Sequence, residues 1–136
     1  MMSVLINGRI KNKKKVEDFV YNTIFDLMPK LKRMVYIDID VVTECDGGCH
    51  ALCHGDKEEV NIELARQVEG VKFTHDEMML NLAHELVHAK QFLRGELHPS
   101  LQTWCREDFS KTPYTETPWE KEAYLLEEQI LTKHWK

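Results

Sequence analysis

The pentapeptide His84-Glu85-Leu86-Val87-His88 lies within a long, mostly apolar stretch, residues 77–93, around which the rest of the chain can be arranged. That stretch has the length and composition of an α-helix. On a helix, residues four apart lie one above the other on the same face, so both imidazoles can reach one metal ion. Glu85 projects about 100° further round the helix. Its carboxylate therefore lies near the metal position but not on the same line along the helix as the two imidazoles.

The residues that flank this motif predict that the helix is buried. Leu, Ala, Val and Phe occupy most of its circumference, which is typical of a central helix. Two imidazoles and a carboxylate inside such a helix are costly to remove from water without strong partners. A zinc ion meets that need, because imidazole and carboxylate groups suit it. We therefore expect one Zn²⁺ per chain, held by His84 and His88 and a third ligand.

The ends of this helix are marked in the sequence. Thr74 followed by Glu77 is the pattern of a capping box, in which the two residues satisfy each other's backbone N–H groups. Gly95 offers a stop, since glycine is common just after the last helical turn. These signals predict a helix over residues 76–94.

Length, composition and charge narrow the class of protein. With 136 residues, 43% of them hydrophobic, residues 1–136 are expected to form a single domain. The formal net charge of −5 argues mildly against a nucleic-acid or anionic membrane surface as partner. No apolar run is long enough to span a membrane, and the apolar part of the N-terminus is too short for a signal peptide. We therefore expect a cytoplasmic protein without a membrane partner.

The other periodic segments predict an α+β fold. Residues 13–27 carry apolar side chains at helical spacing and end before Pro29. Residues 34–42 and 59–64 alternate apolar and polar side chains, as strands with one solvated face do. With a short strand near residues 50–53, they predict a small, mostly antiparallel sheet of three or four strands. The expected order is an N-terminal helix, this sheet, the motif helix and a C-terminal helix.

A second group of potential ligands lies between the two predicted strands: Cys45, Cys49, His50, Cys53 and His54. Thiolates and imidazoles bind zinc, so a second, structural metal is one interpretation. The cysteines, however, lie four apart rather than at the closer spacing of zinc ribbons, and an extended strand would point alternate side chains to opposite faces. We favour an irregular strand with incidental Cys and His. As an edge strand beside the motif helix, it could also pair with a substrate peptide.

The third ligand is expected on the C-terminal helix, which opens at Thr117 and Pro118. Glu120 and Glu122 flank its apolar face at about equal angles on opposite sides, so the helical wheel leaves both open. Ala123 on that face would allow another helix to approach closely. Thr117 with Glu120 also forms a capping-box pattern, which is an alternative use for the Glu120 carboxylate.

The motif at residues 84–88, followed by Glu-x-x-Ala on a later helix, resembles the gluzincins, which are HExxH zinc metallopeptidases of the zincin-like fold. The resemblance covers about residues 60–131 and is greatest to small members, the minigluzincins and the SprT-like and ImmA-like proteins of phages and bacteria. In gluzincins the third ligand lies three residues before that Ala, which favours Glu120, with Glu122 as second choice. The Asp that often follows the Ala is Tyr124 here, so the partner of one ligand His is unassigned.

The resemblance implies a zinc metalloendopeptidase acting on a protein or peptide substrate. His84, His88 and Glu120 would hold the ion and leave one position open. Glu85 would take a proton from the attacking water and pass it to the leaving amine. Three residues remain open as the group that stabilises the oxyanion: Tyr114, Tyr124 and His98.

A different class of function competes with the enzyme: a zinc-containing binding or regulatory module with little or no peptidase activity. The chain is small for a peptidase with its own substrate-binding half. The intact Glu85 favours the enzyme, because a purely structural zinc site does not need it. A nucleic-acid-linked peptidase has only the basic run Lys11–Lys15 in its favour.

Overall fold

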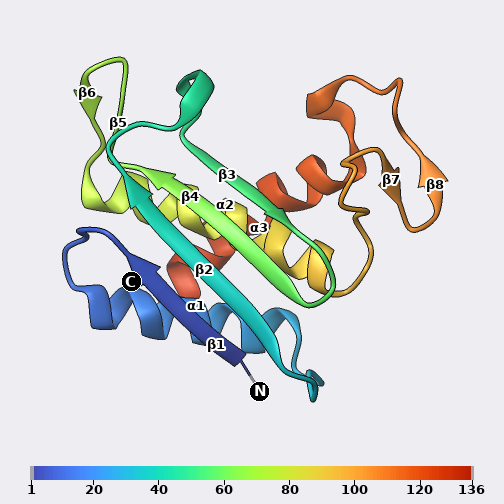
Figure 1. The fold of residues 1–136 in the computed structure, drawn as a ribbon, viewed down its shortest axis with the longest axis horizontal. Helices are drawn as coiled ribbons and strands as arrows, with labels where there is room; N and C mark the ends of the chain where they lie inside the picture. Colours follow the sequence, from blue (N-terminus) through green and yellow to red (C-terminus); the bar gives the residue numbers. More distant parts are fainter. Residues whose placement is uncertain (1, 136) are drawn as a thin grey trace.

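The structure, a computed structural model, describes residues 2–135. In these residues, a four-stranded sheet has three α-helices on one side (Figure 1). The strands of this sheet are β1 (Met2–Asn7), β2 (Val35–Val42), β3 (Ala51–Gly55) and β4 (Glu59–Ala65). The helices are α1 (Lys13–Leu27), α2 (His75–Leu93) and α3 (Pro118–His134). The smaller elements are the 3₁₀ helices η1 (Asp46–Gly48) and η2 (Tyr114–Glu116), and the short strands β5 (Gln67–Val68), β6 (Val71–Lys72), β7 (Thr103–Trp104) and β8 (Glu107–Asp108).

The sheet is mixed, with strand order β1-β2-β4-β3. β1 pairs with β2 and β2 with β4 in parallel, and only the edge strand β3 is antiparallel to its neighbour. The α+β class is confirmed, but the expectation of a mostly antiparallel sheet is wrong. There are two physical reasons. The crossover through α1 returns the chain to pair β2 in parallel with β1, and β3 takes the outer edge of the sheet, so that the chain reverses at β3 and enters β4 parallel to β2.

The alternation in β2 and β4 positions the core on one face of the sheet. In β2, Val35, Ile37 and Ile39 are fully buried, whereas Tyr36 and Asp38 are exposed. The buried side chains pack against the helices in one hydrophobic cluster that also includes residues of α1, α2 and α3. All three helices lie on this side (Figure 1), so the opposite face of the sheet is the solvated one.

Helix α2 is the central helix of this layer. All of its residues from 85 to 93 are buried, and it packs against α1, α3, β3 and β4. The predicted capping box is confirmed: Glu77 N–H donates to the Thr74 hydroxyl (3.1 Å), and Thr74 N–H donates to the Glu77 carboxylate (2.7 Å). Gly95 follows the helix at φ +75°, a backbone conformation that glycine adopts without strain.

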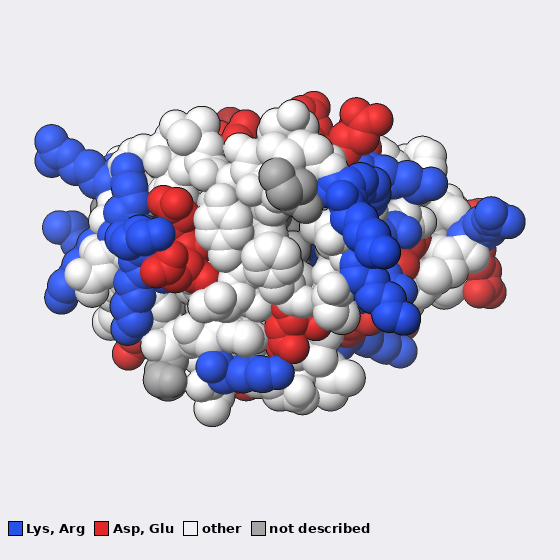
Figure 2. Space-filling view, turned by 90° about the horizontal axis from the view of Figure 1, so that it is seen from below, with Lys and Arg blue, Asp and Glu red and all other residues white. Residues whose placement is uncertain are grey.

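The surface charge is unevenly distributed. The basic run Lys11–Lys15 is exposed, as expected for a solvated helix start, with Lys14 paired to Asp18 (2.9 Å) and the Lys15 ammonium 4.1 Å from the centre of the Trp135 ring. In Figure 2, Lys and Arg side chains gather mainly on the left and the right of the face shown, with mostly uncharged surface and some Asp and Glu side chains between them. In residues 2–135, no helix combines the length and the apolar character needed to cross a bilayer.

Candidate metal centre

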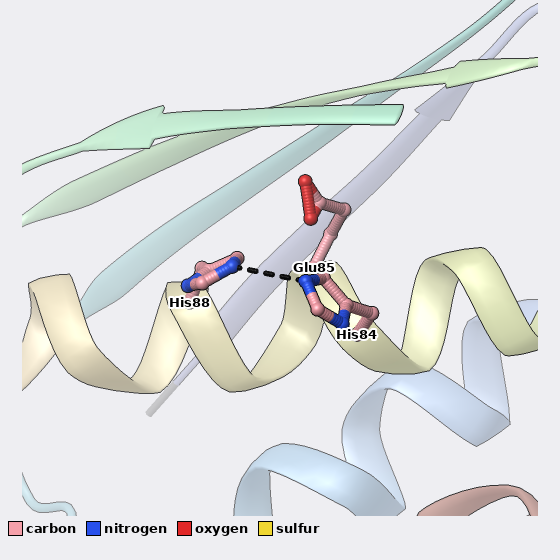
Figure 3. Close-up of side chains that lie close together, drawn as sticks. All are labelled: His84, Glu85 and His88. Carbon is pink, nitrogen blue, oxygen red and sulfur yellow. Dashed lines mark hydrogen bonds between the residues drawn. The ribbon is translucent and has the colours of Figure 1, made fainter. Parts of the chain in front are cut away.

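The two motif histidines lie side by side on α2, as their spacing requires. Their Nε2 atoms are 3.3 Å apart, and the ring planes meet nearly at right angles (77°). Figure 3 shows both rings on the same side of the helix, whereas the Glu85 side chain rises from it toward the strands of the sheet. Ligand atoms of His84, Glu85 and His88 all lie within 4.8 Å of one another. One turn of helix therefore supplies two imidazole nitrogens and a carboxylate around a common point.

Helix α3 brings Glu120 to the same point. Its Oε1 lies 3.0 Å from His84 Nε2 and its Oε2 lies 2.9 Å from His88 Nε2. The side chain is buried, and the approach is possible because Ala123, fully buried, keeps α3 close to α2. The alternative capping box does not form: the Thr117 hydroxyl donates to the backbone oxygen of Tyr114 (2.8 Å).

Glu122 points to a different set of partners. Its Oε1 accepts hydrogen bonds from the Lys90 ammonium (2.5 Å) and from the Gln91 amide (3.1 Å). Both donors are buried residues of α2. The helical wheel of α3 alone could not separate Glu120 from Glu122, because the difference comes from which groups of α2 face each carboxylate.

Glu85 is a buried carboxylate without a hydrogen-bond partner for its Oε2 among the described residues. Burial raises the pKa of Glu85, because the charged form loses its hydration, and the nearby imidazoles of His88 and His84 partly oppose this rise. A buried carboxyl oxygen left unpaired is costly. Such an arrangement suits a carboxylate that hydrogen-bonds a water molecule at the metal position.

Each imidazole also has an outer partner. His88 Nδ1 lies 2.7 Å from Gln91 Oε1, and His84 Nδ1 lies 3.5 Å from Glu127 Oε2. Tyr124 packs its ring against His84, with ring centroids 4.7 Å apart. Sequence reasoning missed Gln91 and Glu127. A signal for Glu127 was present, since it lies about two helical turns beyond Glu120 on the same helix.

The charges of the site attract a cation. Burial by itself would raise the pKa of Glu120, but hydrogen bonds from His84 and His88 lower it to about 2. Burial would lower the pKa of His88, yet the hydrogen bond to Glu120 and the charge of Glu85 raise it. Two carboxylates and two imidazoles therefore meet in a buried space, where each carboxylate stabilises a nearby positive charge. A divalent cation would supply such a charge at the same point.

The residues considered as oxyanion donors lie at different distances from this centre. Both tyrosines, Tyr114 and Tyr124, have largely exposed side chains, and their hydroxyl groups are only partly desolvated. The partial desolvation and a hydrogen bond to the charged Glu120 raise the pKa of Tyr114. Tyr124 is beside His84, and partial desolvation with the Glu120 charge raises its pKa as well. His98 is exposed and its Nδ1 pairs with the Ser100 hydroxyl (2.9 Å). Tyr114 is therefore the one of the three with a hydrogen bond to a candidate ligand.

The segment from Cys45 to His54 brings the Cys45 and Cys49 thiols close together but, among the described residues, gathers no three of its potential ligands at one point. Within β3, Cys53 is buried while His54 is exposed, as alternation predicts. The Cys45 thiol approaches the backbone oxygen of Glu63 (4.0 Å), and the Cys49 thiol that of Asp46 (3.5 Å). Among residues 2–135, the residues close enough together to hold a metal ion are His84, Glu85 and His88. None of them belongs to the Cys45–His54 segment.

The donor set fits zinc. Two imidazole Nε2 atoms and one buried carboxylate converge from two helices, which is the ligand type and number of catalytic zinc sites. A comparison of the sequence with models of known protein families and with curated proteins found no match.

Proposed function

We propose that this chain is a zinc-dependent metalloendopeptidase with a zincin-like arrangement, in which His84, His88 and Glu120 hold the ion. The observation that carries the proposal is the convergence of Glu120, from a separate helix, on both imidazoles of the motif. Three protein ligands leave a fourth position for water or substrate. A structural zinc site, by contrast, uses all four positions for protein ligands.

The chemistry proposed for the site follows from the position of Glu85. A bound zinc ion would lower the pKa of water and polarise a peptide carbonyl. The Glu85 carboxylate lies on the sheet side of the two imidazoles and has an oxygen without a partner (Figure 3). It would accept the proton of the attacking water and deliver it to the leaving amine nitrogen. The burial that raises its pKa makes it a better base than an exposed glutamate.

Substrate would enter between α2 and the edge of the sheet. β3 is the edge strand, packs against α2 and runs antiparallel to β4. A peptide pairing with the free side of β3 would extend the sheet and pass over the zinc position. The Tyr114 hydroxyl, now hydrogen-bonded to Glu120, is the donor that we assign to the developing oxyanion.

The test combines metal analysis with a cleavage assay on Glu85→Gln. We expect one zinc per chain in the parent and in the variant, because Glu85 is not a ligand. The parent should generate new amino termini in an unfolded polypeptide mixture, read by mass spectrometry. The variant should be slower by a factor of about 10² to 10⁴, the usual contribution of a general base. Equal cleavage by parent and variant would refute the role of Glu85.

The binding-module alternative predicts a different combination of results. Zinc would be present in both proteins, but neither would cleave any member of the mixture. Absence of zinc from the parent would rule out both the zinc enzyme and the zinc-containing binding module. The two measurements therefore separate the three outcomes.

A further inference from the structure

His88 is held on its outer side by a chain of hydrogen bonds that continues through four further side chains. His88 Nδ1 lies 2.7 Å from Gln91 Oε1. The Gln91 amide nitrogen donates to Glu122 Oε1 (3.1 Å) and to the backbone oxygen of Trp119 (3.0 Å). The Lys90 ammonium donates to the same Glu122 oxygen and to Glu96 (2.9 Å). The chain joins the motif helix α2 to the start of α3.

The partners in this chain determine the orientation of the Gln91 amide. A carboxylate oxygen and a backbone oxygen can only accept hydrogen bonds, so the group that faces Glu122 and Trp119 must be the NH₂ group. The carbonyl oxygen of Gln91 therefore faces His88. A flipped amide would place an oxygen against two acceptors and lose both bonds. Because Gln91 is fully buried, no water would compensate for that loss.

The orientation of Gln91 in turn determines the tautomer of His88. A carbonyl oxygen only accepts, so Nδ1 of His88 must carry a proton. In a neutral imidazole the other nitrogen, Nε2, then has a free lone pair. Nε2 is the atom that faces His84 and Glu120. In the metal-free protein Nε2 donates to the Glu120 carboxylate (2.9 Å), and the hydrogen-bond chain keeps the other proton on Nδ1, so that Nε2 is the nitrogen that can release its proton to a metal.

His84 lacks an equally fixed support. Its Nδ1 is 3.5 Å from Glu127, a longer contact, and its ring is partly exposed. Lys90, by contrast, is buried between two carboxylates and holds Glu122 in place. A buried chain in which every member is paired is stiffer than a single exposed contact.

We propose that Gln91 and Glu122 are positioning residues that fix His88 with its proton on Nδ1 and so prepare Nε2 to bind the metal. This inference rests on the proposed zinc centre. It also gives a role to Glu122, the other candidate ligand in the sequence. Glu122 contacts Gln91, which in turn contacts the ligand His88. The chain exists in the metal-free protein, so it can be tested apart from catalysis.

The experiment compares three variants with the parent. Gln91→Met keeps the length of the side chain but removes both hydrogen bonds. Glu122→Gln removes the carboxylate that accepts from the Gln91 amide but leaves the Trp119 backbone oxygen as its second acceptor. Gln129→Met is the matched control, because Gln129 is exposed on α3 and bonds only within its own helix. Zinc affinity is measured by competition with a chromophoric chelator, and His88 tautomers by ¹⁵N NMR of metal-free protein at alkaline pH.

We expect Gln91→Met to lose zinc affinity by about 10- to 100-fold, the usual effect of removing the outer partner of a ligand histidine. The fraction of His88 protonated on Nδ1 should fall in the same variant. Glu122→Gln should lose less affinity than Gln91→Met and change the tautomer less, because the Trp119 backbone oxygen still orients the Gln91 amide. A merely structural role for Gln91 would leave the His88 tautomer unchanged in both variants. Gln129→Met should match the parent in both measurements.

Two results would overturn the inference. One is a Gln91→Met protein with parent zinc affinity and an unchanged His88 tautomer. The other is a Gln91→Met protein with lowered zinc affinity but an unchanged His88 tautomer, since the loss would then come from packing and not from the hydrogen-bond direction. If the parent binds no zinc, the proposed function fails and the positioning role fails with it. Parent zinc binding with unchanged variants would refute the positioning role alone.

Discussion

Two regions of this molecule are rich in residue types that bind metals, and they differ in how many of those residues meet at one point. The segment from Cys45 to His54 has five Cys and His residues within ten positions. The α2–α3 pair draws His84 and Glu120 from positions 36 apart in the chain. Only the second region brings ligand atoms of three such residues to one point.

The difference lies in the direction of side chains rather than in their number. On α2 the helical repeat places His84 and His88 on one face, and helix packing adds Glu120. In β3 the two-residue repeat sends Cys53 into the core and His54 into solvent. A dense cluster in the sequence is therefore weaker evidence for a metal site than a sparse set at the correct helical spacing.

The largest expected effect tests this comparison directly. His88→Ala should reduce zinc from one per chain to an undetectable amount, because two ligands rarely retain zinc against a chelator. Cys49→Ser, in the other region, should keep one zinc per chain. The measurement is elemental analysis of both purified variants after dialysis. Loss of zinc in Cys49→Ser would show that the Cys segment, and not the motif, binds the metal.

The next prediction separates the two glutamates of α3. Glu120→Gln should lower zinc affinity by more than about 100-fold, exceeding the effect of an outer-shell change. Glu122→Gln should have a smaller effect, because Glu122 contacts Lys90 and Gln91 instead of the imidazoles. Chelator competition measures both. The reverse order of the two affinities would make Glu122 the ligand.

Close approach of α3 to α2 is the third target. Ala123 is fully buried, so Ala123→Leu should overpack the contact between the helices and destabilise the protein by about 1–3 kcal/mol. Zinc affinity should fall as well, because Glu120 would be displaced. Leu125→Ala, at an exposed position of the same helix, is the control. Denaturant unfolding measures the stability, and chelator competition measures the zinc affinity. A destabilised variant with the zinc affinity of the parent would show that the helix contact does not determine where Glu120 lies.

The fourth prediction concerns the stability of the metal-free protein. The folded-state pKa of Glu85 is raised by burial, so its ionised form destabilises the fold. Glu85→Gln should therefore raise the free energy of unfolding at pH 8 by about 1 kcal/mol, the scale of a buried unpaired polar group. The gain should vanish as the pH falls below the unfolded-state pKa of glutamate, where the carboxyl is neutral in both states. A gain that is constant with pH would show that charge is not its cause.

The smallest effect is expected in the Cys segment. Cys53 is buried in the core and behaves as a small apolar residue. Cys53→Ala should cost about 1 kcal/mol in unfolding free energy through lost packing. The zinc content should remain that of the parent. A change in metal content would contradict the purely packing role.

The helices were the most accurately predicted part of the fold. The α1 boundaries were correct, and α2 begins at His75 instead of residue 76. Local signals decided them: apolar spacing, the Thr74–Glu77 capping box and Gly95. The sheet direction was wrong because strand pairing is not local, and β1 has no alternation strong enough to be recognised without its partner β2.

The sequence by itself determined that His84 and His88 share one face of a buried helix with Glu85 beside them. That follows from the helical repeat, which needs no distant contact. Only the tertiary structure decided that Glu120 meets the imidazoles while Glu122 joins Lys90 and Gln91. The two glutamates are equivalent on their own helix. They differ only because packing of α3 on α2 gives each carboxylate a different set of neighbours.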